Sequence, residues 1–103
     1  MIDDECKWDD DKAAGNLAQH GLSFDTARRV FRDTLAVGYE DTREDYGEER
    51  SVMIGMVQTD DGQQMIITVV YTERGPRKRI ISAWKAEKDE QDAYYTRDTY
   101  DLW

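Results

Sequence analysis

The sequence has one cysteine, one histidine and one proline among its 103 residues. A single thiol, Cys6, excludes a disulfide within the chain, and it has no Cys or His neighbour that would indicate a metal site. We interpret Cys6 as a small buried apolar residue. We therefore expect neither a bound metal nor another cofactor.

Long apolar runs are also missing. No stretch approaches the roughly 20 apolar residues that a membrane span requires. The first five residues include three acids, whereas a signal peptide begins with basic residues. We expect a cytoplasmic protein with a single domain over residues 1–103, since a chain of this length supports one hydrophobic core.

Positive charge is scarce, because 14 basic residues stand against 23 acidic ones and the net charge is −9. Proteins that bind nucleic acid usually have the opposite balance. The distribution is uneven, however: residues 72–88 hold six basic and two acidic residues, a local excess of four positive charges. The sequence is therefore compatible with a basic face on an acidic body.

Two helices are predicted near the N-terminus. Asp9 is expected to cap a helix that runs to His20, and Gly21 is a typical stop. Gly15, inside this helix, costs about 1 kcal/mol relative to Ala. Either another backbone packs closely against Gly15 or the helix is weak. Ser23 is expected to cap a second helix after a very short connection.

Most of the remaining sequence has the alternation and composition of strands. Residues 6–8 end a short first strand, residues 40–49 form an acidic loop, and residues 85–97 have helical composition. Further strands are predicted at residues 35–39, 51–57, 65–71 and 77–84, with turns at 60–62 and 74–76. The expected fold class is α+β: an antiparallel β-sheet of about four strands, two N-terminal helices and a C-terminal helix. We expect the helices on one sheet face, which leaves the other face for a site.

Four blocks of the sequence, in order, resemble the BrnT family of toxins. The first block comprises Trp8, Asp9, Lys12, Asn16, His20, Gly21, Ser23, Phe24 and Ala27. The others are Gly47-Glu48-x-Arg50, residues 70–74, and residues 79–86 without Trp84. The resemblance implies a RelE-like fold and a metal-independent endoribonuclease that inhibits translation. It also implies neutralisation by a BrnA-like antitoxin with a ribbon-helix-helix portion, through which DNA would be contacted only indirectly.

Metal-free RNA cleavage requires a base for the 2′-hydroxyl proton, cations for the phosphoryl oxygens and an acid for the leaving 5′-oxygen. The catalytic candidates are His20, Glu48, Glu49 and Arg79. His20 is the only histidine, and its alternative role is to hydrogen-bond a carbonyl in the last helical turn. The sequence does not choose between Glu48 and Glu49, and either could belong to a solvated acidic loop. The alternative for Arg79 is an ion pair with one of the many acids.

The candidate contacts to RNA phosphates are Lys12, Arg50, Arg74, Arg77 and Lys85. Lys12 lies eight residues before His20, so the two face roughly one direction, although Lys12 could simply be solvated. If the last strand alternates regularly, one of its faces carries Arg77, Arg79, Ile81, Ala83 and Lys85, and the other carries Lys78, Ile80, Ser82 and Trp84. We interpret Trp84 as a ring that stacks a base or is buried beneath the antitoxin.

The sequence therefore supports two hypotheses about function. The first is the endoribonuclease toxin. The second is a catalytically inactive binding module that only complexes the antitoxin and co-represses the operon. The net charge of −9 favours the second, as do Trp84 and Gln19, which stand where the family pattern usually has basic residues.

Overall fold

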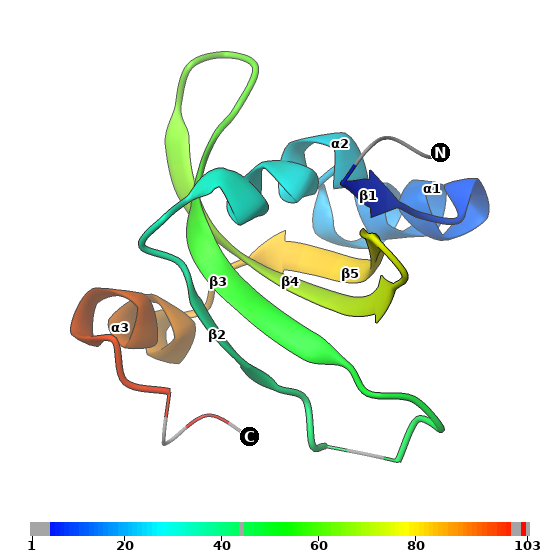
Figure 1. The fold of residues 1–103 in the computed structure, drawn as a ribbon. Helices are drawn as coiled ribbons and strands as arrows, with labels where there is room; N and C mark the ends of the chain where they lie inside the picture. Colours follow the sequence, from blue (N-terminus) through cyan, green and yellow to red (C-terminus); the bar gives the residue numbers. More distant parts are fainter. Residues whose placement is uncertain (1–4, 44, 100–101, 103) are drawn as a thin grey trace.

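The computed structural model describes residues 5–43, 45–99 and 102, and Figure 1 shows the chain as a ribbon. In chain order the elements are β1 (Cys6–Lys7), α1 (Asp10–His20), α2 (Phe24–Ala27), the 3-10 helix η1 (Arg28–Arg32), β2 (Val37–Glu40), β3 (Ser51–Gln58), β4 (Gln64–Arg74), β5 (Arg77–Lys85) and α3 (Lys88–Thr96).

The described strands form one five-stranded sheet in the order β1-β5-β4-β3-β2. Strands β2 to β5 pair antiparallel, which confirms the predicted meander. The prediction of a purely antiparallel sheet of about four strands is wrong, because β1 adds a fifth strand parallel to β5. This pairing joins Cys6 to Lys78 across most of the chain, and no local pattern encodes it.

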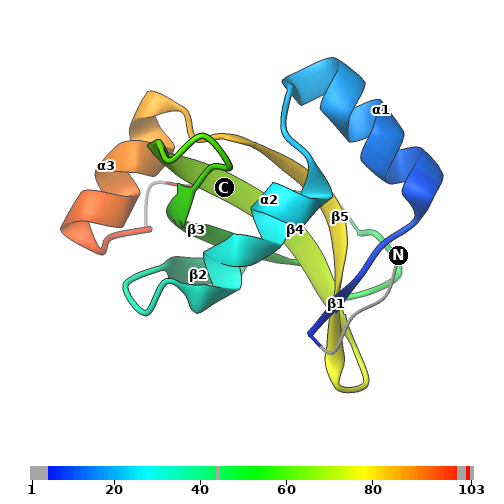
Figure 2. The same cartoon turned by 90° about the horizontal axis from the view of Figure 1, so that it is seen from above.

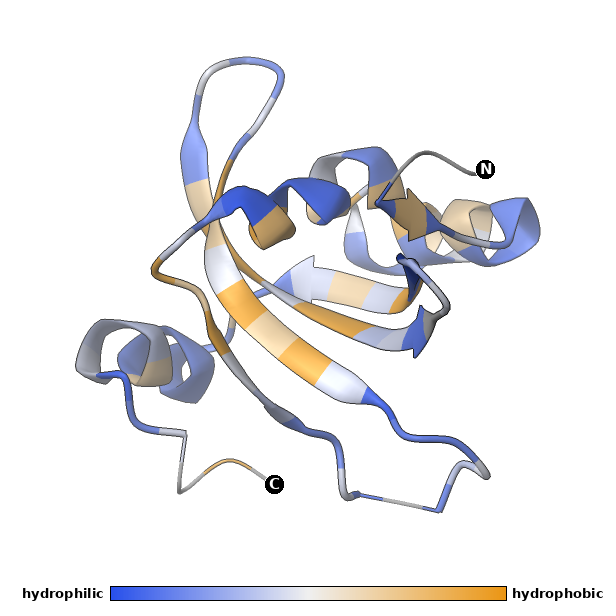
Figure 3. Ribbon diagram, viewed as in Figure 1, coloured by the Kyte–Doolittle hydropathy of each residue, from blue (hydrophilic) through white to orange (hydrophobic). Residues whose placement is uncertain are grey.

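The sheet is covered on both faces, which corrects the expectation that all helices lie on one face. One face packs against α1, α2 and η1 through a cluster that includes Phe24, Val30, Val57 and Ile80; we call it the α1 face. The other, the α3 face, packs against α3 through Val52, Ile54, Val70, Ala93 and Tyr94. Figure 2 shows α1 and α3 on opposite sides of the molecule. Two covered faces explain why β3 and β4 are apolar along much of their length (Figure 3).

The predicted helix caps are confirmed. The Asp9 carboxylate accepts from the N–H groups of Asp11 (2.8 Å) and Lys12 (3.3 Å), and Gly21 ends α1 with φ 69°. The Ser23 hydroxyl accepts from the Thr26 N–H at 3.1 Å and starts α2. Nothing lies within 4 Å of a Cβ built on Gly15, so no backbone packs there and α1 is locally weakened.

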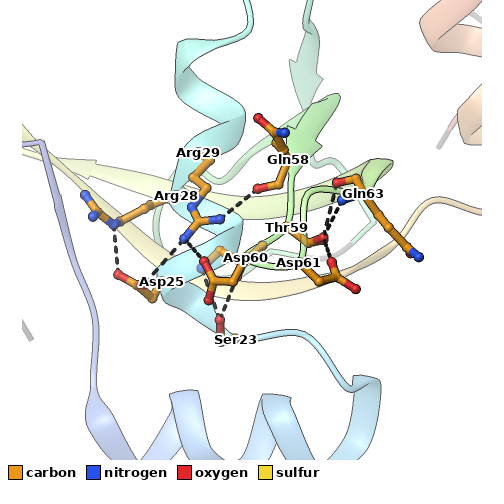
Figure 4. A network of polar contacts seen from close by, with 10 residues as sticks. Ser23, Asp25, Arg28, Arg29, Gln58, Thr59, Asp60, Asp61 and Gln63 are labelled. Atoms are coloured by element: carbon orange, nitrogen blue, oxygen red, sulfur yellow. Dashed lines mark hydrogen bonds and ion pairs between the residues drawn. The ribbon is translucent and has the colours of Figure 1, made fainter.

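Side chains form hydrogen bonds with backbone groups at both edges of the sheet. The buried Asn16 amide accepts from the Ala83 N–H (3.1 Å) and donates to the Ala83 carbonyl (2.9 Å), which fastens α1 to the edge of β5. On the opposite edge Asp33 accepts from the Met56 N–H at 2.8 Å. Beyond it, Arg29 donates to the Gln58 carbonyl at 2.7 Å and joins a network of ion pairs around the β3–β4 hairpin (Figure 4). These contacts satisfy backbone groups of β3 beyond the end of β2.

A β-bulge interrupts β5. On the regular strand β4, Tyr71 is paired with Ile80 and Val70 with Ser82, so Ile81 is the extra residue. The predicted alternation of residues 77–84 is therefore wrong beyond Ile80. Ala83 packs with the α1-face cluster, whereas Trp84 packs with the α3-face cluster.

Candidate functional site

Three arginines gather at the end of the sheet where β3 begins, β4 ends and β5 begins. Thr72 is paired with Arg79, and Ser51 is paired with Tyr71, so Arg50 lies next to Thr72 on its other side. By alternation with Val52, Arg50 projects on the α3 face, as Thr72 and Arg79 do. With adjacent strands about 4.8 Å apart, the Cα atoms of Arg50 and Arg79 are about 10 Å apart.

Arg77 lies two residues before Arg79 on the same strand face. We call Arg50, Arg77 and Arg79 the arginine row. All three residues are half-buried, which restrains their side chains while leaving part of each residue exposed. Planar guanidinium groups suit the oxygens of a phosphodiester, because each can donate two parallel hydrogen bonds.

The Arg50 side chain is held by its neighbours. Its guanidinium lies 4.0 Å from the centre of the Tyr46 ring, and its Nε is 3.8 Å from Glu48 Oε2. Glu49 contributes differently, because its main-chain carbonyl accepts from the Thr72 hydroxyl at 2.9 Å. A hollow of about 690 Å³ beside these residues is lined by Gly47, Glu48, Glu49, Ser51, Thr72 and Glu73. The contact to Arg50 thus brings Glu48 to the arginine row, while Glu49 also lines the hollow.

His20 and Lys85 lie at the opposite end of β5. A hollow of about 490 Å³ there is lined by Gln19, His20, Trp84, Lys85 and Glu87; we call it the Trp84 pocket. The ring centres of His20 and Trp84 are 6.1 Å apart with a tilt of 43°. The indole Nε1–H donates to Glu90 Oε1 at 3.0 Å. His20 and Lys85 are exposed.

The structure therefore separates the predicted site residues into two groups. Trp84 is paired with Thr68 and Arg79 with Thr72, four residues apart on β4, which corresponds to about 13 Å. His20 is thus next to Trp84 and not next to Arg79. The His20 imidazole therefore lies at the Trp84 end of β5, away from the end of the strand that holds Arg79.

Lys12 is exposed near the start of α1, about 12 Å along the helix axis from His20. Hydrogen bonds from the N–H groups of Lys12 and Asp11 lower the pKa of Asp9, and the charges of Lys12 and Arg79 lower it further. Lys12 therefore lies at the arginine-row end of the molecule. Arg74 is the last residue of β4, and its side chain lies outside the described part of the structure.

Two residues that position the site were not identified from the sequence. Tyr46, under Arg50, sits in a polar loop without periodicity, and its aromatic character was the only signal. Glu90 is 3% exposed and binds the Trp84 indole. The spacing of Glu87 and Glu90, which form a capping box at the start of α3, was a local signal for it.

Two further properties bear on the kind of site. Among the residues that the structure describes, no group of three or more His, Cys, Asp and Glu side chains is arranged to hold a metal ion. None of the described helices is long and apolar enough to span a bilayer.

Comparison with known proteins identifies the family. A search of curated proteins found no match. The family model for BrnT, described as a ribonuclease toxin of type II toxin–antitoxin systems, matches residues 8–90, which include the caps of α1 and α2, the whole sheet apart from β1, and both groups of site residues. The chain therefore belongs to the BrnT family of ribonuclease toxins.

Proposed function

We propose that this chain is an endoribonuclease that cleaves RNA without a metal ion, and that Arg50 and Arg79 of the arginine row bind the scissile phosphate. The observation that carries the proposal is the cross-strand row in which Arg50 and Arg79 flank Thr72 on one sheet face. Membership of a ribonuclease toxin family supports RNA as the substrate.

Glu48 is the proposed general base. Its carboxylate takes the proton of the 2′-hydroxyl, and the 2′-oxygen attacks the adjacent phosphorus while the bond to the 5′-oxygen breaks. Arg50 and Arg79 stabilise the negative charge that builds on the phosphoryl oxygens. The 5′-oxygen takes a proton from water, so the products are a 2′,3′-cyclic phosphate and a 5′-hydroxyl. Glu49, which lines the same hollow, is the alternative base.

Other basic residues would bind the RNA backbone on either side of the cleaved bond. Arg77, beside Arg79 on β5, and Lys12, at the start of α1, lie at this end of the molecule. Arg74, at the end of β4, belongs to the same proposed set. Their positive charge would offset the repulsion between RNA and a chain whose net charge is −9.

The proposed partner is a BrnA-like antitoxin with a ribbon-helix-helix portion. A type II toxin family implies a protein antitoxin, and this supports the proposal. DNA would be bound by that antitoxin and contacted by this chain only indirectly, as the net charge of −9 favours. The complex would form in the cytoplasm.

The second candidate function is a non-catalytic module that only binds the antitoxin. The position of His20 at the other end of β5 favours this second function. A histidine at the scissile bond could give the leaving 5′-oxygen its proton, and a ribonuclease would gain from such an acid.

Cleavage by the purified chain distinguishes these functions. We expect it to cut an end-labelled RNA and to leave 5′-hydroxyl and 2′,3′-cyclic phosphate ends, at the same rate with EDTA as without it. Substitution Glu48→Gln should slow cleavage about 100-fold or more, since it removes the base. Intact RNA after incubation with the folded chain would favour the non-catalytic module, and a loss of cleavage in EDTA would contradict the metal-free mechanism.

A further inference from the structure

We propose that the Trp84 pocket is a subsite for an unpaired nucleobase of the RNA whose phosphate lies on the arginine row. The inference rests on the proposed function, since it takes RNA as the ligand. It reassigns His20 from the cleavage chemistry to recognition of the substrate, and it keeps Lys85 as a contact to an RNA phosphate. It also gives Trp84 a direct contact with that substrate.

The β-bulge places the Trp84 side chain, which forms one wall of this pocket, on the same sheet face as the arginine row. Without the extra residue Ile81, Trp84 and Arg79 would project on opposite faces of β5. With it, both lie opposite threonines that share the α3 face of β4, about 13 Å apart. More than one nucleotide is needed to cross that distance. A base in the pocket therefore belongs to a different nucleotide of the same strand from the one that is cleaved.

The indole ring is fixed before any ligand arrives. Its N–H donates to Glu90 Oε1 at 3.0 Å, and the same oxygen accepts from the Glu87 N–H at 2.8 Å. Glu90 itself is 3% exposed, so this anchor lies beneath the surface. A ring held in one orientation loses little conformational entropy when a base stacks on it.

The open side of the pocket offers groups that suit a nucleotide. Trp84 is half-buried, and His20, tilted by 43°, forms an exposed aromatic wall beside it. The exposed Gln19 amide can donate to and accept from a base edge, and the exposed Lys85 ammonium can pair with the adjoining phosphate. Stacking on an aromatic ring accepts any base, so the structure favours recognition of single-stranded RNA of little sequence preference.

Binding of an RNA that cannot be cleaved tests this subsite. A fluorescein-labelled 2′-O-methyl hexaadenylate lacks the attacking hydroxyl, and its affinity follows from fluorescence polarisation. We expect Trp84→Ala to weaken its binding about tenfold and Trp84→Phe, which keeps an aromatic ring, to stay within about threefold. His20→Ala, at an exposed position, should weaken binding by a smaller factor.

Tryptophan fluorescence identifies the residue in contact. We expect unlabelled 2′-O-methyl hexaadenylate to quench the emission of the wild-type chain and of the matched control Trp8→Phe. Trp8 packs edge-on against Phe24, outside the pocket. Trp84→Phe should show no quenching although it binds. This comparison decides the question even where Trp84→Ala is unfolded.

Two results would overturn the subsite. The first is quenching that persists in Trp84→Phe. The second is a folded Trp84→Ala that binds the 2′-O-methyl hexaadenylate like the wild type. If that variant also loses its affinity for the antitoxin, the pocket belongs to the antitoxin interface. Because the probe cannot be cut, these results are independent of whether the chain cleaves RNA.

Discussion

At the scale of single residues, Asp33 joins three elements. Its carboxylate accepts from the Leu35 N–H (2.9 Å), the Met56 N–H (2.8 Å) and the Tyr94 hydroxyl (2.7 Å), so it ties the end of η1 to β3 and α3. Partial burial raises the pKa of Asp33, but these hydrogen bonds outweigh burial and the pKa falls below its ordinary value of 3.8.

We expect Asp33→Asn to lower the free energy of unfolding by about 2 kcal/mol at pH 7, because it removes hydrogen bonds to a charged acceptor. A pKa lowered by folding stabilises the protein above the unfolded pKa, and this stability is lost as the pH falls through the folded value. The difference between wild type and variant should therefore shrink below pH 3.8. Urea unfolding from pH 7 to pH 3 measures it.

The matched control for this substitution is Asp92→Asn, which breaks only an exposed pair with Lys88. Exposed pairs contribute little, so its unfolding free energy should differ little from wild type at any pH. A deficit in Asp33→Asn that stays constant down to pH 3 would show that Asp33 is not bound as a carboxylate.

Local residue signals were predictable, and contacts between distant residues were not. Asp9, Ser23 and Gly21 act on backbone groups within four residues, so their roles follow from the sequence. The choice between Glu48 and Glu49 depends on where the Arg50 side chain lies, and Tyr46 helps to fix that position. The local sequence around Glu48 and Glu49 does not contain this information.

At the scale of elements, the bulge in β5 decides which side chains share a surface. The strand range was predicted closely, as residues 77–84 against Arg77–Lys85. The face of Trp84 was predicted wrongly, because the extra residue appears only when β5 is paired with β4. The position of α3 on the second face was also missed, since its apolar stripe is short and its main buried residues are Ala93 and Tyr94.

Two glycines give opposite predictions for the elements that contain them. Gly15→Ala should stabilise the protein by about 1 kcal/mol, because nothing lies within 4 Å of the added methyl group and Ala favours the helix. Gly55→Ala should destabilise it by about 2 kcal/mol. Its methyl group would lie 2.8 Å from Val30 Cγ2 and 3.1 Å from Ala36 Cβ, so η1 must move away from β3.

Thermal unfolding of the two variants and the wild type under one condition checks the sign of both changes in stability. The same chemical change is made in each variant, so the comparison isolates the surroundings of the methyl group. Equal melting temperatures for Gly15→Ala and Gly55→Ala would contradict the close approach of η1 to β3.

At the scale of the whole molecule, the fold assembles a basic site on an acidic protein. Residues 72–88 carry a local positive excess in the sequence, but Arg50 joins them only because β3 lies beside β4. The parallel pairing of β1 with β5 likewise connects segments from the two ends of the chain. The basic hairpin was therefore predictable, whereas the composition of the arginine row required the sheet order.

The central claim is that Arg50 and Arg79 of the arginine row stabilise the charge that builds on the scissile phosphate during RNA cleavage. Two arginine substitutions test it as a matched pair. Arg79→Ala removes a guanidinium from the row, and Arg28→Ala removes one that pairs with Asp25 at 3.1 Å near the α1 face. Both variants should retain the circular dichroism spectrum of the wild type, so that differences in rate report on the site.

The decisive measurement is the single-turnover rate of RNA cleavage by the two variants beside the wild type. We predict that Arg79→Ala is about 100-fold slower or more, as for loss of a group that stabilises transition-state charge. Arg28→Ala should cleave at the wild-type rate. A folded Arg79→Ala that cleaves as fast as Arg28→Ala would contradict the account.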